Sequence, residues 1–387
     1  MSTLSILLPP CSPDYSGVAS VLYELGGMVV LHDASGCTGN YLGYDEPRWI
    51  DTRSLVYCSG LRHIDAVLGR DDKLVSRVVA AAESFHPAFI AIIGSPVPML
   101  VGTDYQGIAR EIEAKTGIPS FGFDTTGLDF YDKGVVMATK ELLKRFAPRT
   151  NHYQQIPHTI NIVGATPLDW GNNGNITACR SFFAQNGIQV TCCLSMSCTL
   201  DDIKQAPTAA LNVAVSEAGI QIAEFMENEY HIPYVVGIPL GDGSRMLQKV
   251  RTCLAGKRST SESSPNVTTS PRRILIVGEQ VLSCSLRDEI LHRWGIPCTV
   301  AVLFNHRKEL LQPGDFPFVT EKDLRTIFAH EEFTDVFGDP LLAQLDQGKT
   351  IRFHSVPTIA LSSKFHEAQI RHFLGDDGEA LLREAVS

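Results

Sequence analysis

The chain has 387 residues, of which 44% are hydrophobic and 20% are charged, and its formal net charge is -10. This length exceeds what one hydrophobic core usually serves, so two or three domains are expected. The negative charge argues against nucleic-acid binding, and no apolar run approaches the ~20 residues of a membrane span. The first residues lack the basic region of a secretory signal, so we expect a cytoplasmic protein with reduced cysteines.

In the first third of the chain, short apolar runs alternate with helical patterns. Several of these runs are apolar on both faces, which is typical of parallel strands buried between two layers of helices. The patterns predict strands at 28–31, 54–57, 88–93 and 118–123, and helices at 73–84, 106–115 and 134–146. They indicate a doubly wound α/β domain at residues 1–150.

The same alternation recurs twice more along the chain. A second α/β domain is expected at 151–255, with strands near 158–164, 187–191, 211–215 and 232–239 and a helix at 217–230. Residues 256–272 are rich in Ser, Thr and Pro and nearly devoid of large apolar side chains, so they are expected to form a linker. A third domain is expected at 273–387. The predicted fold class is α/β, with three Rossmann-like domains and mostly parallel sheets.

The turns after the predicted strands lack nucleotide-binding motifs. The segments that follow Gly164 and Gly278 do not match G-x-G-x-x-G, and the chain contains no G-x-x-x-x-G-K-[ST] sequence. A bound dinucleotide and ATP hydrolysis by this chain are therefore not expected. No arrangement typical of a serine hydrolase or a zinc protease occurs either.

Two cysteines follow apolar runs at points where the chain breaks into Pro, Ser and Gly. Cys11 ends the run Ile6-Leu-Leu-Pro-Pro, and Cys37 lies in a glycine turn after the strand-like run that begins at Met28. Glycine lets the backbone approach a bulky inorganic group, whereas a structural cysteine more often lies inside the apolar run. These positions favour iron–sulfur ligation.

Several motifs occur in a particular order and spacing over most of the chain. These are Pro10-Cys11-Ser, Leu31-His-Asp-Ala-Ser-Gly-Cys37, Ile92-Ile-Gly-Ser-Pro, Asn161-Ile-Val-Gly-Ala-Thr-Pro and Thr199-Leu-Asp-Asp-Ile-Lys. In these motifs the chain resembles the nitrogenase component 1 family, which includes the subunits of the molybdenum–iron protein, their cofactor-scaffold relatives and nitrogenase-like tetrapyrrole reductases. The resemblance implies a cluster-binding first domain in a three-domain plan.

Four positions matter for how closely the chain follows this family. Family members commonly have a third cluster cysteine where this chain has Ser95, and a hydroxyl is a harder, poorer iron donor than a thiolate. Cys58, at the end of another predicted strand, could supply the missing thiol. Cys198 lies in a turn where family members meet substrate or cofactor, or else is an idle loop thiol. Ser216 replaces the cysteine that carries the large cofactor of true nitrogenases, so dinitrogen reduction is disfavoured.

The resemblance implies an oxidoreductase in which Cys11, Cys37 and Cys58 ligate a 4Fe-4S cluster, or a larger cluster bridging an interface, near Ser95 and Cys198. Its expected partners are an ATP-dependent iron–sulfur reductase protein and a second subunit, either a copy of this chain or a related one. The substrate stays open. Two alternatives also stay open: a non-catalytic scaffold or carrier for a metallocofactor, and a redox-silent ligand-binding module in which Cys11 and Cys37 are dispensable.

Overall fold

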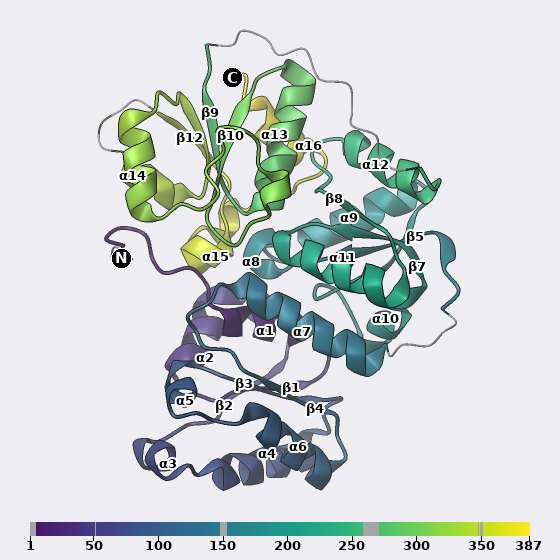
Figure 1. Cartoon of the computed structure of the whole chain (residues 1–387), viewed down its shortest axis with the longest axis vertical. Coiled ribbons are helices and arrows are strands. Elements are labelled where there is room, and N and C mark those ends of the chain that lie inside the picture. The colour runs from purple at the N-terminus through teal and green to yellow at the C-terminus, as the bar shows by residue number, and fades with distance from the viewer. Residues whose placement is uncertain (1–4, 51, 148–152, 258–270, 347, 349–350) are drawn as a thin grey trace.

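The computed structural model describes residues 5–50, 52–147, 153–257, 271–346, 348 and 351–387. These residues form three parallel four-stranded sheets covered by helices, as the fold class predicted (Figure 1). Each sheet with its helices is called a lobe here: lobe 1 spans 14–146, lobe 2 spans 156–254 and lobe 3 spans 274–383. Most of the predicted linker 256–272 lies outside the described residues, and the predicted domain limits remain a prediction.

In lobe 1 the strands follow the order β2-β1-β3-β4, so the first strand lies between the second and the third. All four residues of β1 are buried because their apolar side chains contact helices on both faces of the sheet. The strands are β1 (Met28–Leu31), β2 (Leu55–Cys58), β3 (Ile90–Ile93) and β4 (Ser120–Phe123). All four were predicted within two residues.

Helices of lobe 1 cover both faces of this sheet. They are α1 (Asp14–Leu22), α2 (Gly36–Asn40), α3 (His63–Leu68), α4 (Asp71–Phe85), α5 (Pro96–Leu100), α6 (Tyr105–Thr116) and α7 (Tyr131–Phe146), with short helices η1 (Tyr41–Asp45) and η2 (Pro47–Trp49). Helices α1 and α7 cross at Gly17 and Gly134, where an added Cβ would lie 1.9 Å from a backbone oxygen of the other helix. Only glycine allows this approach.

Lobes 2 and 3 repeat the strand order of lobe 1, as β6-β5-β7-β8 and β10-β9-β11-β12. Lobe 2 contains β5 (Ile156–Val163), β6 (Gln189–Cys193), β7 (Ala209–Ala214), β8 (Tyr234–Val236), α8 (Pro167–Trp170), α9 (Gly174–Gln185), α10 (Leu200–Gln205), η3 (Ala206–Thr208), α11 (Glu217–Tyr230) and α12 (Ser244–Leu254). Lobe 3 contains β9 (Ile274–Gly278), β10 (Cys298–Val302), β11 (Asp335–Gly338), β12 (Arg352–Ser355), α13 (Gln280–Trp294), α14 (Glu321–His330), α15 (Ile359–Ser362), α16 (Asp376–Arg383), η4 (Lys308–Leu310), η5 (Pro340–Leu345) and η6 (Ser363–Gln369).

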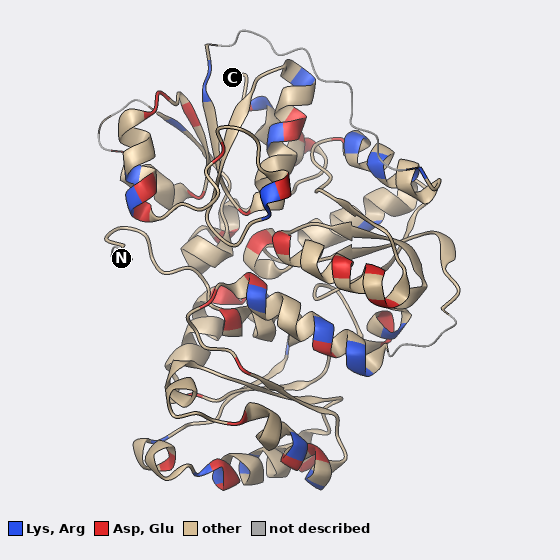
Figure 2. Ribbon diagram, in the orientation of Figure 1, with Lys and Arg blue, Asp and Glu red and all other residues tan. Residues whose placement is uncertain are grey.

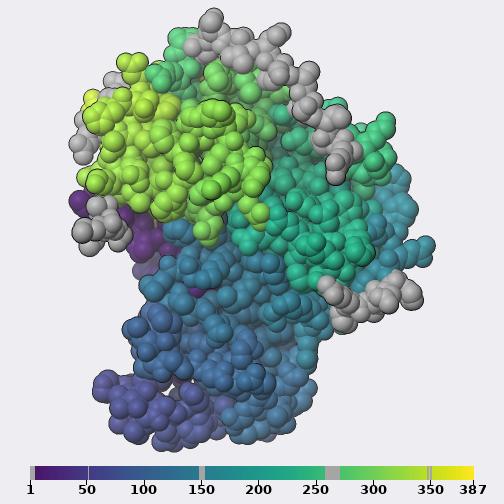
Figure 3. Space-filling view, viewed as in Figure 1, coloured from purple at the N-terminus to yellow at the C-terminus, as the bar shows by residue number. Residues whose placement is uncertain are grey.

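Lobes 2 and 3 form the larger body of the molecule, and lobe 1 projects from it (Figure 3). Helix α7 joins the two parts, since it contacts α1 of lobe 1 and both α10 and α11 of lobe 2. One large hydrophobic core includes residues of all three lobes, and a second smaller core lies between the first sheet and helices α4 and α6. Within the described part of the chain, no helix combines the length and apolarity that crossing a membrane requires.

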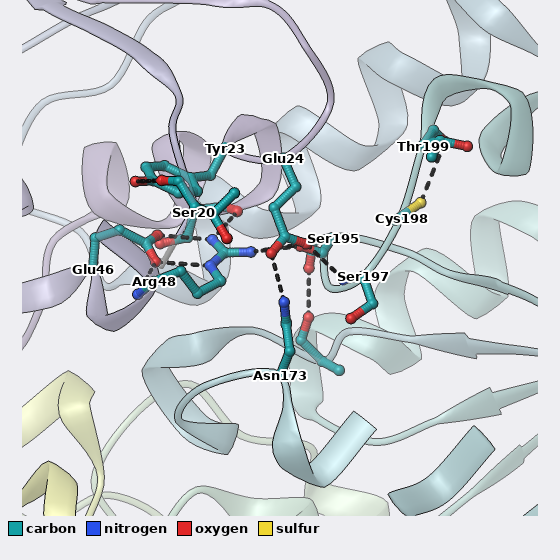
Figure 4. Close-up of polar contacts among 12 residues, drawn as sticks. Ser20, Tyr23, Glu24, Glu46, Arg48, Asn173, Ser195, Ser197, Cys198 and Thr199 are labelled. Carbon is teal, nitrogen blue, oxygen red and sulfur yellow. Dashed lines mark hydrogen bonds and ion pairs between the residues drawn. The ribbon is translucent and has the colours of Figure 1, made fainter. Parts of the chain in front are cut away.

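Lobes 1 and 2 are also joined by a buried guanidinium group (Figure 4). Arg48, whose side chain is 2% exposed, donates to both carboxylate oxygens of Glu46 at 2.7 Å and lies 3.6 Å from Glu24. It also donates to the backbone oxygen of Ser195 in lobe 2 at 3.1 Å. Glu24 in turn accepts from the side chain of Asn173 and from the backbone N–H of Ser197, both at 2.6 Å. The network therefore joins the two lobes through charge-assisted hydrogen bonds.

Replacing Arg48 with Met should destabilise the protein by about 3–5 kcal/mol, because Glu46 would remain buried without its cation. Urea unfolding followed by circular dichroism measures the change. Arg70→Met is the matched control, because Arg70 pairs with Asp72 at an exposed site, and it should change stability little. Equal stability of the two variants would contradict the role given to the buried pair.

Candidate functional site

The carboxyl ends of the first three strands of lobe 1 lie at one edge of the sheet. Leu31, the last residue of β1, is in register with Cys58 of β2 and with Ile93 of β3. The segments that follow these strands carry Cys37 and Ser95, so parallel pairing brings three of the predicted site residues to the same edge. Helices α2, α3 and α5 start from this edge (Figure 1).

Asp33 holds the turn that carries Cys37. One carboxylate oxygen accepts from the backbone N–H groups of Ser35 at 3.0 Å and of Thr38 at 3.1 Å. Ser35 has a φ of 148°, a backbone conformation that residues other than glycine rarely adopt. The Asp33 hydrogen bonds therefore stabilise a strained turn immediately before Cys37.

The Cys37 thiol is hydrogen-bonded to the hydroxyl groups of Ser95 and Tyr15 and to the Asp33 carboxylate. Burial raises the pKa of Cys37, and the negative charge of Asp33 raises it further, while the bonds with Tyr15 and Ser95 act in the opposite direction. The Ser95 hydroxyl also donates to the backbone oxygen of His32 at 2.8 Å. The structure thus brings together Cys37 and Ser95. The sequence patterns did not indicate Tyr15, which reaches the site from α1.

Cys58 lies at the same edge of the sheet but has different partners. Its sulfur donates to the backbone oxygen of Asp33 at 3.3 Å and accepts from the N–H of Gly60, also at 3.3 Å. The adjacent Ser59 hydroxyl bonds to Nδ1 of His32 at 2.9 Å. Burial lowers the pKa of His32 to about 4, so this imidazole is neutral at physiological pH.

Cys11 lies on a segment that is bound to lobe 3. One carboxylate oxygen of Glu321 accepts from three consecutive N–H groups, of Ile6, Leu7 and Leu8, at 2.8–2.9 Å. Burial raises the pKa of Cys11 to about 12, and the nearby carboxylates of Asp339 and Asp132 contribute to the increase. The Cys11 thiol therefore faces acidic groups of lobes 1 and 3.

Cys198 lies in lobe 2, in the loop between β6 and α10. Its sulfur is 3.5 Å from that of Cys192 and 3.5 Å from the backbone oxygen of Thr199, and the residue is 4% exposed. Ser216 caps helix α11: its hydroxyl accepts from the N–H of Gly219 at 3.0 Å and donates to the oxygen of Gly164 at 2.7 Å. A capping role accounts for this serine.

The predicted ligands include thiols, the donors that hold iron–sulfur clusters, but one chain brings fewer of these donors together than a four-iron cluster needs. Among the described residues, no group of three or more His, Cys, Asp or Glu side chains is arranged to hold a metal ion. Among the described residues, Cys37 and Ser95 are the two predicted donors that interact directly, and a four-iron cluster needs four ligands. The chain therefore presents at most part of a ligand set. The roles of Cys11, Cys37, Cys58, Ser95 and Cys198 remain predictions.

A second group of functional interest lies where the three lobes meet, and the sequence patterns did not indicate it. Tyr131 of lobe 1 donates to Asp169 of lobe 2 through its hydroxyl group. Glu279 of lobe 3 accepts from the backbone N–H of Glu217 in lobe 2 at 2.8 Å. Asn305 of lobe 3 donates to Asp132 of lobe 1 at 2.8 Å. Each lobe is thereby hydrogen-bonded to both others.

The carboxyl groups at this junction have unusual proton affinities. Burial, followed by the charge of Asp169, raises the pKa of Glu279 to about 8, and burial raises that of Asp169 to about 7. One oxygen of Asp132 is buried without a hydrogen-bond partner among the described residues. Figure 2 shows acidic residues at the amino ends of α7 and α11, which contact each other near the junction. The carboxyl groups of Glu279 and Asp169 therefore bind protons near neutral pH.

Comparisons with known proteins identify the class of oxidoreductase to which this fold belongs. The family model of the nitrogenase component 1 type oxidoreductase matches residues 13–312. The chain belongs to this family. Cys11 lies just before the matched segment, and the other four predicted site residues lie within it.

Among curated relatives, the nitrogenase iron-molybdenum cofactor biosynthesis protein NifE of Methanosarcina barkeri is 28% identical over 238 residues, which cover 57% of this chain and 50% of that protein. The nitrogenase molybdenum-iron protein alpha chain of Clostridium pasteurianum is 26% identical, over 46% of this chain and 33% of the relative. This chain therefore spans half or less of the length of these curated relatives. The solved structure of nitrogenase Cp1 at pH 6.5 aligns with a TM-score of 0.74 at 13% identity, over 100% of this chain and 93% of that one, and supports the fold.

A light-independent protochlorophyllide reductase of Leptolyngbya boryana is also similar. One of its subunits is 22% identical to this chain over 221 residues, which cover 54% of this chain and 43% of that protein. The family relatives therefore include both reductases and a protein of cofactor biosynthesis.

Stability should fall as pH rises from about 4.5 to about 8, because folded Glu279 keeps a proton that the unfolded chain releases from its ordinary pKa of 4.5 upward. Glu279→Gln removes this titration and keeps one of the two side-chain oxygens that accept backbone N–H bonds. We expect its melting temperature to fall less than that of the native protein between pH 5 and pH 8. Glu111→Gln, at a half-exposed site, controls for the loss of one carboxylate. Identical pH profiles for the native protein and Glu279→Gln would contradict the prediction.

Proposed function

We propose that this chain is a component 1-like subunit of a two-component reductase. It accepts electrons from an ATP-dependent iron–sulfur reductase protein and reduces a substrate or metallocofactor that is not yet identified. An iron–sulfur cluster is the cofactor, a 4Fe-4S cluster or a larger one bridging an interface. The observation that supports this most directly is the common edge of Cys37, Ser95 and Cys58, in a chain that belongs to this oxidoreductase family.

The electrostatics of this edge favour a metal ligand over a nucleophilic thiol. Reactive cysteines have low pKa values because cationic groups surround them. Cys37 instead lies beside Asp33, and Cys11 lies near Asp339 and Asp132, so both thiols have raised pKa values. A carboxylate that disfavours a thiolate favours a cationic metal. When bound, the cluster supplies one-electron transfer, while Asp33 and Tyr15 position the Cys37 sulfur.

Exposed apolar side chains on the segments after the strands of lobe 1 support completion of the site by a second subunit. In α5 and the residue after it, Val97, Leu100 and Val101 are 49%, 78% and 53% exposed. Ile64, Val67 and Leu68 of α3 are each more than half exposed. Because α3 and α5 start from the strand ends beside Cys58 and Ser95, a subunit that covers them would lie over the thiols. The partner is a second copy of this chain or a related subunit.

A scaffold or carrier for a metallocofactor is the second candidate function. It is supported by the similarity to NifE, a protein of iron-molybdenum cofactor biosynthesis. A carrier would transfer its metal to another protein without consuming a small substrate. A reductase would instead convert a small substrate while its iron–sulfur partner protein hydrolyses ATP. Transfer of metal to another protein and formation of a reduced product therefore distinguish the two functions.

Cys37→Ala should remove most of the iron and acid-labile sulfide from protein purified without oxygen and reconstituted, because it deletes the thiol beside Ser95. Iron and sulfide analysis, visible absorption and electron paramagnetic resonance measure the loss. Cys253→Ala is the matched control, because this partly exposed cysteine lies on α12 of lobe 2, and it should keep the full content. A colourless, iron-free native protein, or full iron in Cys37→Ala, would refute the ligand assignment.

Leu100→Glu should shift the native oligomer toward monomer in size-exclusion chromatography with light scattering, because it places a charge on the exposed apolar surface of α5. Ile156→Glu is the control, since Ile156 is half exposed at the start of β5 in lobe 2. If both variants elute as the native protein does, the α5 surface is not the interface. If a native monomer carries a complete cluster, no second subunit is needed.

A further inference from the structure

Two buried thiols in lobe 2 lie in contact with each other. Cys192 is at the carboxyl end of β6 and Cys198 is in the loop before α10, and their sulfur atoms are 3.5 Å apart. Cys192 is fully buried, and 4% of Cys198 is exposed. A disulfide bond is about 2.05 Å long, so the sulfurs would have to approach by about 1.5 Å to form one.

The neighbouring thiol of Cys193 is directed elsewhere. Successive residues of a strand face opposite sides of the sheet. Cys193 is hydrogen-bonded to Arg180, whereas Cys192 is hydrogen-bonded to Cys198. The hydrogen bond with Cys198, together with burial, holds the pKa of Cys192 well above its ordinary value. Among the three thiols of this segment, Cys192 and Cys198 therefore form the pair in contact.

The loop between the two thiols is strained and joins lobes 1 and 2 (Figure 4). Ser195 and Ser197 have φ values of 95° and 47°, in the left-handed region that favours glycine. The loop keeps this conformation because Arg48 binds the oxygen of Ser195 and Glu24 accepts from the N–H of Ser197. A shift of Cys198 toward Cys192 would pull on Ser197, the adjacent residue.

We propose that Cys192 and Cys198 form a redox-active dithiol that hydrogen peroxide converts to a disulfide. Peroxide first oxidises the Cys198 sulfur to a sulfenic acid and releases one water. The Cys192 sulfur then displaces the hydroxyl group of the sulfenic acid: the S–S bond forms, the S–O bond breaks, and the thiol proton leaves with the hydroxyl as a second water. In total, two thiols lose two electrons and two protons, and one peroxide becomes two waters.

The hydrogen bond with Cys198 and burial hold Cys192 in the less reactive thiol form, so the oxidation is slow, and burial also limits the oxidant to a small molecule. A small molecule can diffuse to a residue that is only 4% exposed, whereas a protein disulfide cannot reach it for direct exchange. The disulfide would shift the loop that bears Ser197, and with it the hydrogen bond to Glu24. The dithiol therefore links peroxide exposure to the contact between lobes 1 and 2. This inference does not depend on the proposed reaction or on cluster ligation by Cys11, Cys37 and Cys58.

In the experiment, the 387-residue chain is purified without oxygen and treated with hydrogen peroxide, free thiols are blocked with iodoacetamide, and the protein is digested with trypsin. Residues 181–204 form one tryptic peptide that contains Cys192, Cys193 and Cys198. We expect this peptide to lose two hydrogens in mass and to carry a single alkyl group, on Cys193. Treatment with dithiothreitol before alkylation should restore three alkylated cysteines. A bond involving Cys193, or three alkylated cysteines after oxidation, would overturn the proposal.

Variants separate this pair from general cysteine oxidation. Cys193→Ser should still form the disulfide, whereas Cys198→Ser should not. If Cys193→Ser fails to fold, the position of the alkyl group in the native protein decides the outcome alone. Hydrogen exchange of residues 195–199 should be faster in the oxidised native protein than in the reduced protein and unchanged by peroxide in Cys198→Ser. Equal exchange in oxidised and reduced native protein would overturn the link to the lobe contact.

Discussion

The central constraint on this structure is the parallel pairing of a first strand with its second and third strands, repeated in all three sheets. Parallel strands end at the same edge, so every loop that follows a strand starts from one side of its sheet. In lobe 1 this brings together residues as distant in sequence as Cys37 and Ser95. In lobe 2 it places the loop of Ser195 and Ser197 against lobe 1.

Much of the fold could be predicted from the sequence, because buried parallel strands are short apolar runs between glycine turns. The sequence pattern does not predict β12, because Arg352 and His354 interrupt its apolar pattern at the edge of the third sheet. The pairing of Cys37 with Ser95 was predictable, because both residues follow strands of one sheet. Tyr15 was not predictable as a partner of Cys37, because it comes from a helix whose position depends on packing against α7.

The junction of the three lobes could not be read from the sequence for a related reason. Its carboxyl groups lie in ordinary helix and turn segments, and their unusual pKa values arise only when the lobes bury them together. Asp169 and Glu279 are 110 residues apart, yet the charge of one raises the pKa of the other. Such long-range electrostatic contacts leave no local pattern. Burial without a compensating cation is costly, so these groups hold protons instead.

Charged groups are used differently at the two lobe contacts. Between lobes 1 and 2, the cation Arg48 compensates buried Glu46 and Glu24, so this contact keeps its charges. At the three-lobe junction, Tyr131 and backbone N–H groups are the partners of Asp169 and Glu279, so neutralisation comes from bound protons. The first contact depends little on pH, because a paired guanidinium does not titrate in the physiological range. The junction weakens as pH rises, because Asp169 and Glu279 then lose their protons, so it is the more pH-sensitive of the two contacts.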